Sequence, residues 1–232
     1  MPTLRSVFVH MRRYIPQLVV TALWVALCFA GAGQLDWTRG WICAGVYVAS
    51  TWGTGLLIIA YNPGLMEARA QMKHDNTCRF DRVFMSVFFP LSLIQPLVAG
   101  LDALRFRWLP MPPWTILPGA LLCLLATGII CSALLVNPFA EATVRLQSER
   151  DHHVIDAGVY RIVRHPMYVG LILLYPSLAL MFGSGWAMVV ALLIGIAFVW
   201  RTAREDKFLR SELTGYSDYA RRTRFRLIPG LW

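Results

Sequence analysis

Residues 158–170, Gly-Val-Tyr-Arg-Ile-Val-Arg-His-Pro-Met-Tyr-Val-Gly, set basic side chains directly before a long apolar run. Pro166 suits the first turn of a helix, because the N–H that it lacks would be unpaired there in any case. Arg164 and His165 then lie at the positive end of the helix dipole, where cations are unfavourable unless an anion accompanies them. The stretch therefore indicates either a juxtamembrane anchor whose arginines reach lipid headgroups or a site for a bound anionic group.

A second charged cluster, Arg201-x-x-x-Glu205-Asp206, follows the last apolar run. Arg201 and Glu205 are four residues apart and share one face of a helix, which on its own predicts a weakly stabilising surface ion pair. Asp206 adds a carboxylate that points elsewhere on the same helix. Together with the basic and aromatic stretch before residue 170, the two acids could instead hold a ligand that carries both an ammonium and a carboxylate group.

The composition indicates that membrane-spanning helices position these two charged clusters. Of the 232 residues, 57% are hydrophobic and only 15% are charged, which is far more apolar than a soluble domain. A bilayer core of about 30 Å requires roughly 20 apolar residues per helix, and the candidate runs are 15–34, 41–60, 83–100, 114–136, 167–182 and 186–200. Gly183-Ser184-Gly185 predicts a tight turn between the last two, with one re-entrant hairpin as the alternative. We therefore expect an all-α polytopic membrane protein with about six spans.

The distribution of positive charge explains the net charge of +9 and predicts the topology. Of the 22 Lys and Arg residues, only Arg39, Arg105 and Arg107 fall in the loops on one side, which leaves 19 on the other. The basic residues around the first spans on that richer side include Arg5, Arg12, Arg13 and Lys73. The positive-inside rule makes this side cytoplasmic and puts both termini there. Topology and anionic lipids account for the excess, so membrane lipids, and no nucleic acid, are the expected partners of the basic face.

The polar stretches 61–82, 137–166 and 201–232 all fall on this cytoplasmic side, so the functional site is expected to face the cytoplasm. The first apolar run lacks a small-residue cleavage site, and we expect a retained span and not a signal peptide. The five cysteines form no Cys-x-x-Cys pair and have no metal-site spacing with histidine. They are therefore expected to be core residues, with no metal site.

Taken together, these features resemble a known family. The order is Gly-x-Tyr at 158–160, Arg-His-Pro-x-Tyr-x-Gly at 164–170, an apolar hairpin, Arg-x-x-x-Glu-acid at 201–206, Gly-x-x-x-Tyr at 215–219 and a late Ile-Pro. This is similar to the isoprenylcysteine carboxyl methyltransferase family of integral membrane enzymes, whose bacterial members share a segment like Asn62 to Arg69. The resemblance is specific over 137–232 and looser before it. One departure is Asp206, where the family usually has a second Glu and therefore a longer reach.

The resemblance implies an S-adenosyl-L-methionine site built from the cytoplasmic loop and the ends of the last spans. Residues 1–136 would form the first four spans with the loop 61–82, and 137–232 would form the methyltransferase core, in a bacterial inner membrane. Arg201 would bind the methyl acceptor, and Arg201, Glu205 and Tyr168 would form the catalytic group. The implied cofactor-contacting residues are Gln147, His152, His153, Val154, Ile155, Tyr160, His165, Pro166, Met167, Tyr168 and Glu205.

The residue types agree with this chemistry. His165 and the helix terminus suit the carboxylate of S-adenosylmethionine, Glu205 suits its ammonium, and Tyr160 can stack on its adenine. Methyl transfer from a sulfonium is an in-line displacement that mainly needs alignment of the acceptor. A carboxylate acceptor needs no base, whereas a thiol, which ionises near pH ~8.5, or an amine must lose a proton.

These residues leave the acceptor open. The family name favours a lipophilic or lipidated carboxylate, such as that of an isoprenylated cysteine. A small or lipophilic thiol and a phospholipid amine are alternatives, because bacterial relatives need not encounter prenylated proteins. A different class, a non-catalytic membrane protein that binds an anionic lipid or a nucleotide, predicts no methyl transfer. The sequence does not fix the oligomeric state.

Overall fold

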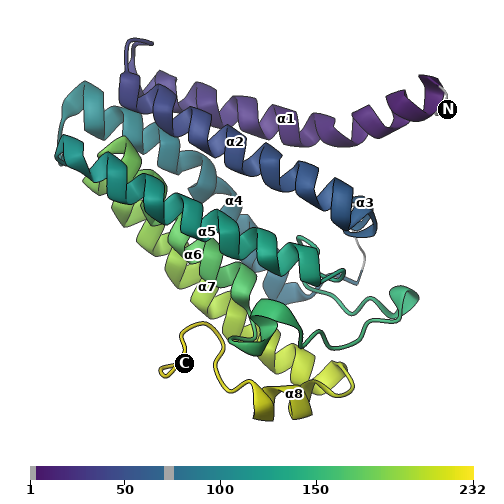
Figure 1. Ribbon diagram of the computed structural model, residues 1–232. Helices are drawn as coiled ribbons and strands as arrows, with labels where there is room; N and C mark the ends of the chain where they lie inside the picture. The colour runs from purple at the N-terminus through teal and green to yellow at the C-terminus, as the bar shows by residue number, and fades with distance from the viewer. Residues whose placement is uncertain (1–3, 71–75) are drawn as a thin grey trace.

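The computed structural model in Figure 1 describes residues 4–70 and 76–232, and no β-strand occurs in these two ranges. Its short 3₁₀ helices are Pro113–Thr115, Ser148–Arg150 and Gly158–Arg161, and a π-helical turn, Leu101–Phe106, continues α4. The predicted all-α class is confirmed. The α-helices are α1 (Leu4–Ala32), α2 (Thr38–Tyr61), α3 (Pro63–Ala70), α4 (Arg79–Gly100), α5 (Ile116–Val136), α6 (Pro166–Phe182), α7 (Gly185–Glu212) and α8 (Tyr216–Arg222).

Five helical segments of the described chain are long and apolar enough to cross a membrane. They are Ile15–Ala32, Thr38–Tyr61, Arg79–Phe106, Pro113–Val136 and Gly185–Glu212. The sixth expected span is α6, an apolar helix of only 17 residues. The protein is therefore a polytopic membrane protein with five long spans and one shorter apolar helix between two of them.

Glycine or asparagine stands at the end of several helices, and the turn predicted at 183–185 is present. Asn62 follows α2 and Asn137 follows α5, in each case directly before a proline. Gly183 has a φ of 77° and turns the chain from α6 into α7, so these are two separate helices. Gly215, with a φ of 82°, stands between α7 and α8. Helix α7 continues past the apolar run to Glu212, as predicted.

The segments 137–165 and 213–232 lie together at one end of the bundle, which we call the polar end (Figure 1). The C-terminal ends of α2, α5 and α7 and the N-terminal ends of α4 and α6 point toward it. The polar end therefore collects the long polar stretches. Lys73 and the side chains of Arg5, Arg12 and Arg13, part of the predicted basic side, lie outside the described residues.

At the opposite end, buried polar groups fix the turns between helices. Arg39, from the first turn of α2, donates to the carbonyls of Leu180 (2.8 Å) and Met181 (3.0 Å) at the end of α6. Asp102 is fully buried and accepts from Ser184 Oγ (2.6 Å) and from the backbone N–H of Trp186 (3.1 Å). These contacts satisfy helix-terminal groups that lipid could not satisfy.

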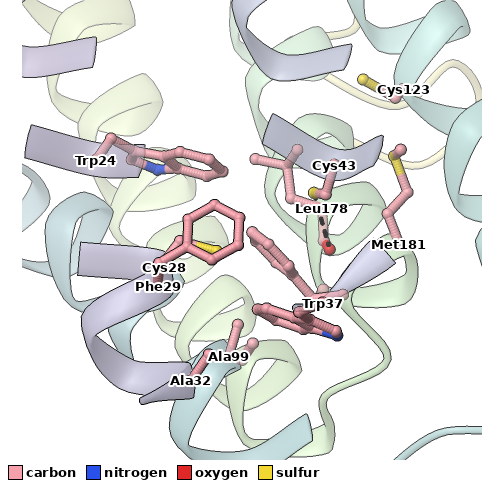
Figure 2. Close-up of a cluster of buried hydrophobic side chains, with 13 residues drawn as sticks. Trp24, Cys28, Phe29, Ala32, Trp37, Cys43, Ala99, Cys123, Leu178 and Met181 are labelled. Carbon is pink, nitrogen blue, oxygen red and sulfur yellow. Dashed lines mark hydrogen bonds between the residues drawn. The ribbon is translucent and has the colours of Figure 1, made fainter. Parts of the chain in front are cut away.

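The core in this half of the bundle is a cluster of aromatic side chains and cysteines (Figure 2). Trp24 of α1 stacks on Tyr47 of α2, with ring centroids 4.0 Å apart. Cys43 Sγ donates to the carbonyl of Leu178 at 3.9 Å, and Cys28, like Cys43, is a free, buried thiol. The prediction that the cysteines of the spans are core residues is therefore confirmed for this cluster.

Helices α5 and α6 pack closely because α6 presents a glycine to α5. A Cβ atom added at Gly170 would lie 2.5 Å from Ile130 Cγ1 and 2.8 Å from the carbonyl oxygen of Ala126. Such contacts let two backbones approach, as is common between membrane helices. The start of α6, which carries His165 and Tyr168, is thereby held against the end of α5.

Replacing Gly170 by alanine is expected to destabilise the protein, because the added methyl group would overlap the backbone of α5. The matched change in α7, Gly195→Ala, adds a methyl group that is 4.0 Å from Ile172 Cγ2. It should be neutral or slightly stabilising, since alanine is the better helix former. In thermal unfolding in detergent, Gly170→Ala should melt about 5 °C lower than wild type. Equal midpoints for the two variants would contradict the close contact.

Candidate functional site

A single cavity at the polar end brings most of the predicted site residues together. Its empty space, including the open mouth, measures about 760 Å³. Pro166, by contrast, is buried at the first position of α6 and acts on the backbone. Ten of the eleven residues that the resemblance assigns to the cofactor line the cavity: Gln147, His152, His153, Val154, Ile155, Tyr160, His165, Met167, Tyr168 and Glu205.

Asp206 of α7 is the anchor of this end of the molecule. Its side chain is fully buried. Arg164 Nε donates to Oδ1 at 2.6 Å, and Arg210 Nε and Arg226 Nε donate to Oδ2 at 3.1 and 3.0 Å. Tyr216 OH donates to Oδ1 at 3.1 Å. The anion that should accompany Arg164 is therefore supplied by the chain itself. The idea that Asp206 shares a ligand with Glu205 is thereby corrected, because its two oxygens are already occupied.

The C-terminal segment is bound to the residues before α6. The backbone N–H groups of Arg164 and His165 donate to the carbonyls of Phe225 (2.9 Å) and Arg226 (3.0 Å). The Arg164 side chain also donates to the carbonyl of Thr223 at 2.7 Å. The start of α6 is thus covered by protein. This corrects the view of this helix terminus as an open anion site.

Tyr168 and Glu205 form a polar contact in the cavity wall. Tyr168 OH donates to Glu205 Oε2 at 2.5 Å, which links α6 to α7. The Tyr168 ring stacks on the imidazole of His165, with centroids 5.7 Å apart and planes inclined by 5°. A carboxylate beside two stacked rings suits a cationic group in the cavity, through charge and through the faces of the rings.

Arg201 does not pair with Glu205, although their spacing predicted it. Arg201 Nε lies 2.8 Å from Asp81 Oδ1, and Nη2 donates to the carbonyl of Ala142 at 2.8 Å. The guanidinium lies over the ring of Phe84, 4.4 Å from its centroid. With 4% of its surface exposed, Arg201 is buried, and it is not among the residues that line the cavity. Arg201 therefore pairs with the buried Asp81 of α4 and not with Glu205 of its own helix.

Asp81 supports the cavity wall but was not among the site residues predicted from the sequence. It is fully buried at the start of α4, and its Oδ2 accepts from the backbone N–H of Val144 at 2.9 Å. The N–H of Cys78 donates to the carbonyl of the same valine at 3.0 Å. Val144 lines the cavity, so the first turn of α4 holds the cavity wall. The available signal was an acid placed at the edge of an apolar run, where isolated charges are costly.

The loop after α5 is held by its own charges. Arg145 makes two hydrogen bonds of 2.9 Å to the carboxylate of Glu141, and both side chains are buried. Gln147 Nε2 donates to the carbonyl of Phe139 at 2.8 Å, and its Oε1 accepts from Arg150 at 2.7 Å. Gln147 therefore lines the cavity chiefly as a brace of the loop.

Two buried aromatic groups complete the wall. Tyr160 OH accepts from Asn137 Nδ2 at 3.0 Å, and Tyr219 OH donates to the Tyr160 carbonyl at 2.7 Å. Burial raises the pKa of Tyr160, so its hydroxyl stays protonated. Phe139 packs on His152, with ring centroids 4.5 Å apart. Burial, together with the neighbouring His153, lowers the pKa of His152 below its ordinary value of 6.5, which leaves a neutral imidazole at pH 7.

A second, larger hollow, which we call the chamber, lies between α1, α2, α3, α5 and α6. Its empty space, including its open side, measures about 1800 Å³. Apolar side chains such as Ile58, Ile130 and Leu174 make up much of its lining, and Arg69 of α3 also lines it. Ala142 lines the chamber, whereas the adjacent Glu141 lines the cavity. The chain at 140–142 is therefore a shared wall between the two spaces.

Residues 114–214 match the model of the phospholipid methyltransferase family. The match covers somewhat less than half of the 232 residues. It runs from the start of α5 to the turn before α8 and includes the ten predicted residues that line the cavity. The family includes isoprenylcysteine carboxyl methyltransferase-like membrane enzymes, so the resemblance is confirmed, and it indicates membrane methyltransferase activity. No curated protein matches the chain. Asp81 and Arg69 lie outside the matched region.

Replacing Asp206 by asparagine should strongly destabilise the methyltransferase, because three arginines would lose their shared buried counter-charge. Removing one partner of a buried pair costs about 3–5 kcal/mol, which lowers the melting temperature by about 10 °C. Asp218→Asn is the matched control, since that exposed acid pairs only with Arg221 at the surface and should matter little. Thermal unfolding in detergent measures both. A midpoint for Asp206→Asn equal to that of the control would refute the anchor.

The neutral state of His152 predicts a pH dependence of stability. Because its pKa is lowered on folding, the unfolded chain binds more protons at this position below about pH 6.5, and stability falls as the pH drops through that region. His152→Gln removes this contribution, so its melting temperature should fall less steeply than that of wild type between about pH 7 and 5. Parallel curves for the two proteins would show that His152 does not contribute.

Proposed function

We propose that this membrane methyltransferase transfers the methyl group of S-adenosyl-L-methionine to a lipophilic acceptor. One observation carries the proposal: residues from the loop 147–160, the start of α6 and the end of α7 line one cavity in the combination that the resemblance assigns to this cofactor. These segments are far apart in sequence. Their convergence on one space supports a single bound molecule.

The walls of the cavity suit the groups of this cofactor. Glu205 offers a carboxylate to the ammonium or to the sulfonium, and the rings of His165 and Tyr168 offer faces that attract a cation. Tyr160 and Phe139 provide surfaces against which an adenine can stack. Bound in this way, S-adenosylmethionine supplies an activated methyl group, and the remaining task of the chain is to align the acceptor.

The acceptor would occupy the chamber and meet the cofactor at the shared wall near residues 140–142. In the transfer, the lone pair of the acceptor atom forms a bond to the methyl carbon while the carbon–sulfur bond breaks, leaving a neutral thioether. With a carboxylate or thiolate acceptor, two oppositely charged reactants would become neutral products, so a dry site would favour the step, and alignment would supply much of the rate. The chamber, bounded by membrane helices, is a suitable route for an acceptor that arrives from lipid.

The favoured acceptor is a carboxylate, such as that of an isoprenylated cysteine, which attacks without a base. The phospholipid methyltransferase description of the family favours a second candidate, the amine of a phospholipid headgroup. An amine, or a lipophilic thiol, would have to lose a proton, and Glu205 with its hydrogen-bonded Tyr168 is the group best placed to accept it. Arg201, assigned to the acceptor by the resemblance, would serve instead to position Tyr168, whose ring lies 5.1 Å from its guanidinium.

The proposed function includes an orientation in the membrane. The polar end would face the cytoplasm, where the cofactor is dissolved, with both termini on that side and the enzyme in a bacterial inner membrane. Residues 137–232 would form the methyltransferase core. Two elements of residues 1–136, α3 and the first turn of α4, would complete the walls of its site.

Calorimetry of the purified protein in detergent with S-adenosylhomocysteine tests the cofactor assignment. Wild type should bind, and Glu205→Gln should bind at least about tenfold more weakly through loss of a charged contact. Glu212→Gln, an exposed acid at the end of the same helix, should bind like wild type. Absence of binding to folded wild-type protein at millimolar ligand would remove the proposal. Equal affinities of wild type and Glu205→Gln would remove the role of Glu205.

A further inference from the structure

Arg69 lies at the boundary between the two spaces. It belongs to α3, which is outside both the matched family region and the group of residues to which the resemblance gives a role. Its Nη1 donates to the carbonyl of Ala140 at 2.6 Å, and Ala140 itself lines the cavity. Because Arg69 also lines the chamber, its guanidinium stands at the shared wall and can be reached from the lipid side.

The carboxylates near Arg69 are committed to other arginines. Asp81 is paired with Arg201, and Glu141 is held by Arg145 through two hydrogen bonds. Arg201 is moreover a second positive charge close to Arg69. Burial, and then this neighbour, lower the pKa of Arg69, although a guanidinium keeps its proton in proteins. The part of the chain that the structure describes thus leaves the Arg69 charge without a carboxylate of its own.

The chamber has the shape and chemistry for a long chain attached to a charged group. Along α2 its lining runs from Tyr47 to Ile59, a length of roughly 18 Å at 1.5 Å per residue. Leu134, Leu171 and other apolar side chains face it from the remaining helices. Among the described residues that line the chamber, Arg69 is the one with a positively charged side chain, and Glu67, the other charged residue, is exposed.

We propose that Arg69 binds an oxyanion on the acceptor and so selects amphiphiles whose long apolar chain lies in the chamber. The inference rests on the proposed function and specifies its acceptor. The Ala140 carbonyl accepts from only one N–H group of the guanidinium. A carboxylate or phosphate oxygen would accept hydrogen bonds from the other N–H groups. The acceptor would then enter with its tail between α2 and α5 and its anionic group at the shared wall, next to the cavity. Arg69 is in this role a specificity-determining residue.

Three probes with the same chain test this selection: palmitate, hexadecyl phosphate and hexadecanol. In calorimetry with detergent-solubilised wild-type protein, at least one anionic probe should bind about tenfold or more tightly than the alcohol. The tighter of the two anions identifies a carboxylate or a phosphate as the recognised group. Arg69→Gln should lose this preference, and Arg79→Gln, an exposed arginine at the start of α4, should keep it. A wild type without preference, or an Arg69→Gln variant that retains it, would overturn the inference.

A second pair of variants tests the chamber separately from the charge. Gly55 lines the chamber, and a Cβ atom added there would have only Met66 Cε nearby, at 3.6 Å. Gly55→Leu should therefore fill the space and weaken all three probes alike. Gly45→Leu, on an exposed part of the same helix where an added Cβ meets nothing within 4 Å, should weaken none. Equal behaviour of these two variants would exclude the chamber as the binding place.

Binding of S-adenosylhomocysteine distinguishes a failure of the inference about Arg69 from a failure of the proposed function. Arg69→Gln and Gly55→Leu should retain this binding, which also demonstrates that both variants are folded. If wild type binds S-adenosylhomocysteine but shows no preference for anionic probes, the inference about Arg69 fails and the proposed function stands. If wild type does not bind S-adenosylhomocysteine, the proposed function fails, and the selection of a methyl acceptor by Arg69 fails with it.

Discussion

The polar end of this protein depends on one buried carboxylate, that of Asp206. Burying a charge is expensive unless its partners are close and well oriented, and here three arginines and a tyrosine hydroxyl converge on two oxygens. Those partners come from the segment before α6, from α7 itself, from α8 and from the C-terminal segment. The segments that carry these partners are therefore held to one another through Asp206. A longer acid in its place would have to push these groups apart, which gives a physical reason for the shorter side chain.

Near Asp206, one short segment of backbone separates the polar cavity from the largely apolar chamber. The cavity is lined by polar and aromatic groups and opens to water, whereas the chamber is largely apolar and lies among helices that face lipid. The backbone at 140–142 separates them, and Arg69 and Arg201 each donate to a carbonyl of this short segment. On the proposed function, the polar cofactor and the lipophilic acceptor would approach the same wall from opposite sides, each from its preferred medium.

Hydropathy, proline and glycine predicted the helices, and the resemblance to a known family supplied the residues that line the cavity. Contacts between distant segments were not predictable. The four-residue spacing of Arg201 and Glu205 indicated a surface pair, yet Arg201 pairs with a buried carboxylate in α4 and lies over two aromatic rings, and Glu205 accepts a hydrogen bond from Tyr168 instead. Asp81 and Arg69 were missed for the same reason, since only packing brings α3 and α4 to the loop after α5.

The 17-residue length of α6 has a consequence for the depth of the reaction. Such a helix is roughly 25 Å long, about 5 Å less than the hydrocarbon thickness of an ordinary bilayer. This hydrophobic mismatch leaves His165 and Tyr168, at its first turn, below the plane of the headgroups when its other end is level with the opposite interface. The aqueous phase must then dip into one leaflet to reach them. On the proposed function, a methyl group would therefore be delivered to an atom that never rises to the membrane surface, and the rate would depend on bilayer thickness.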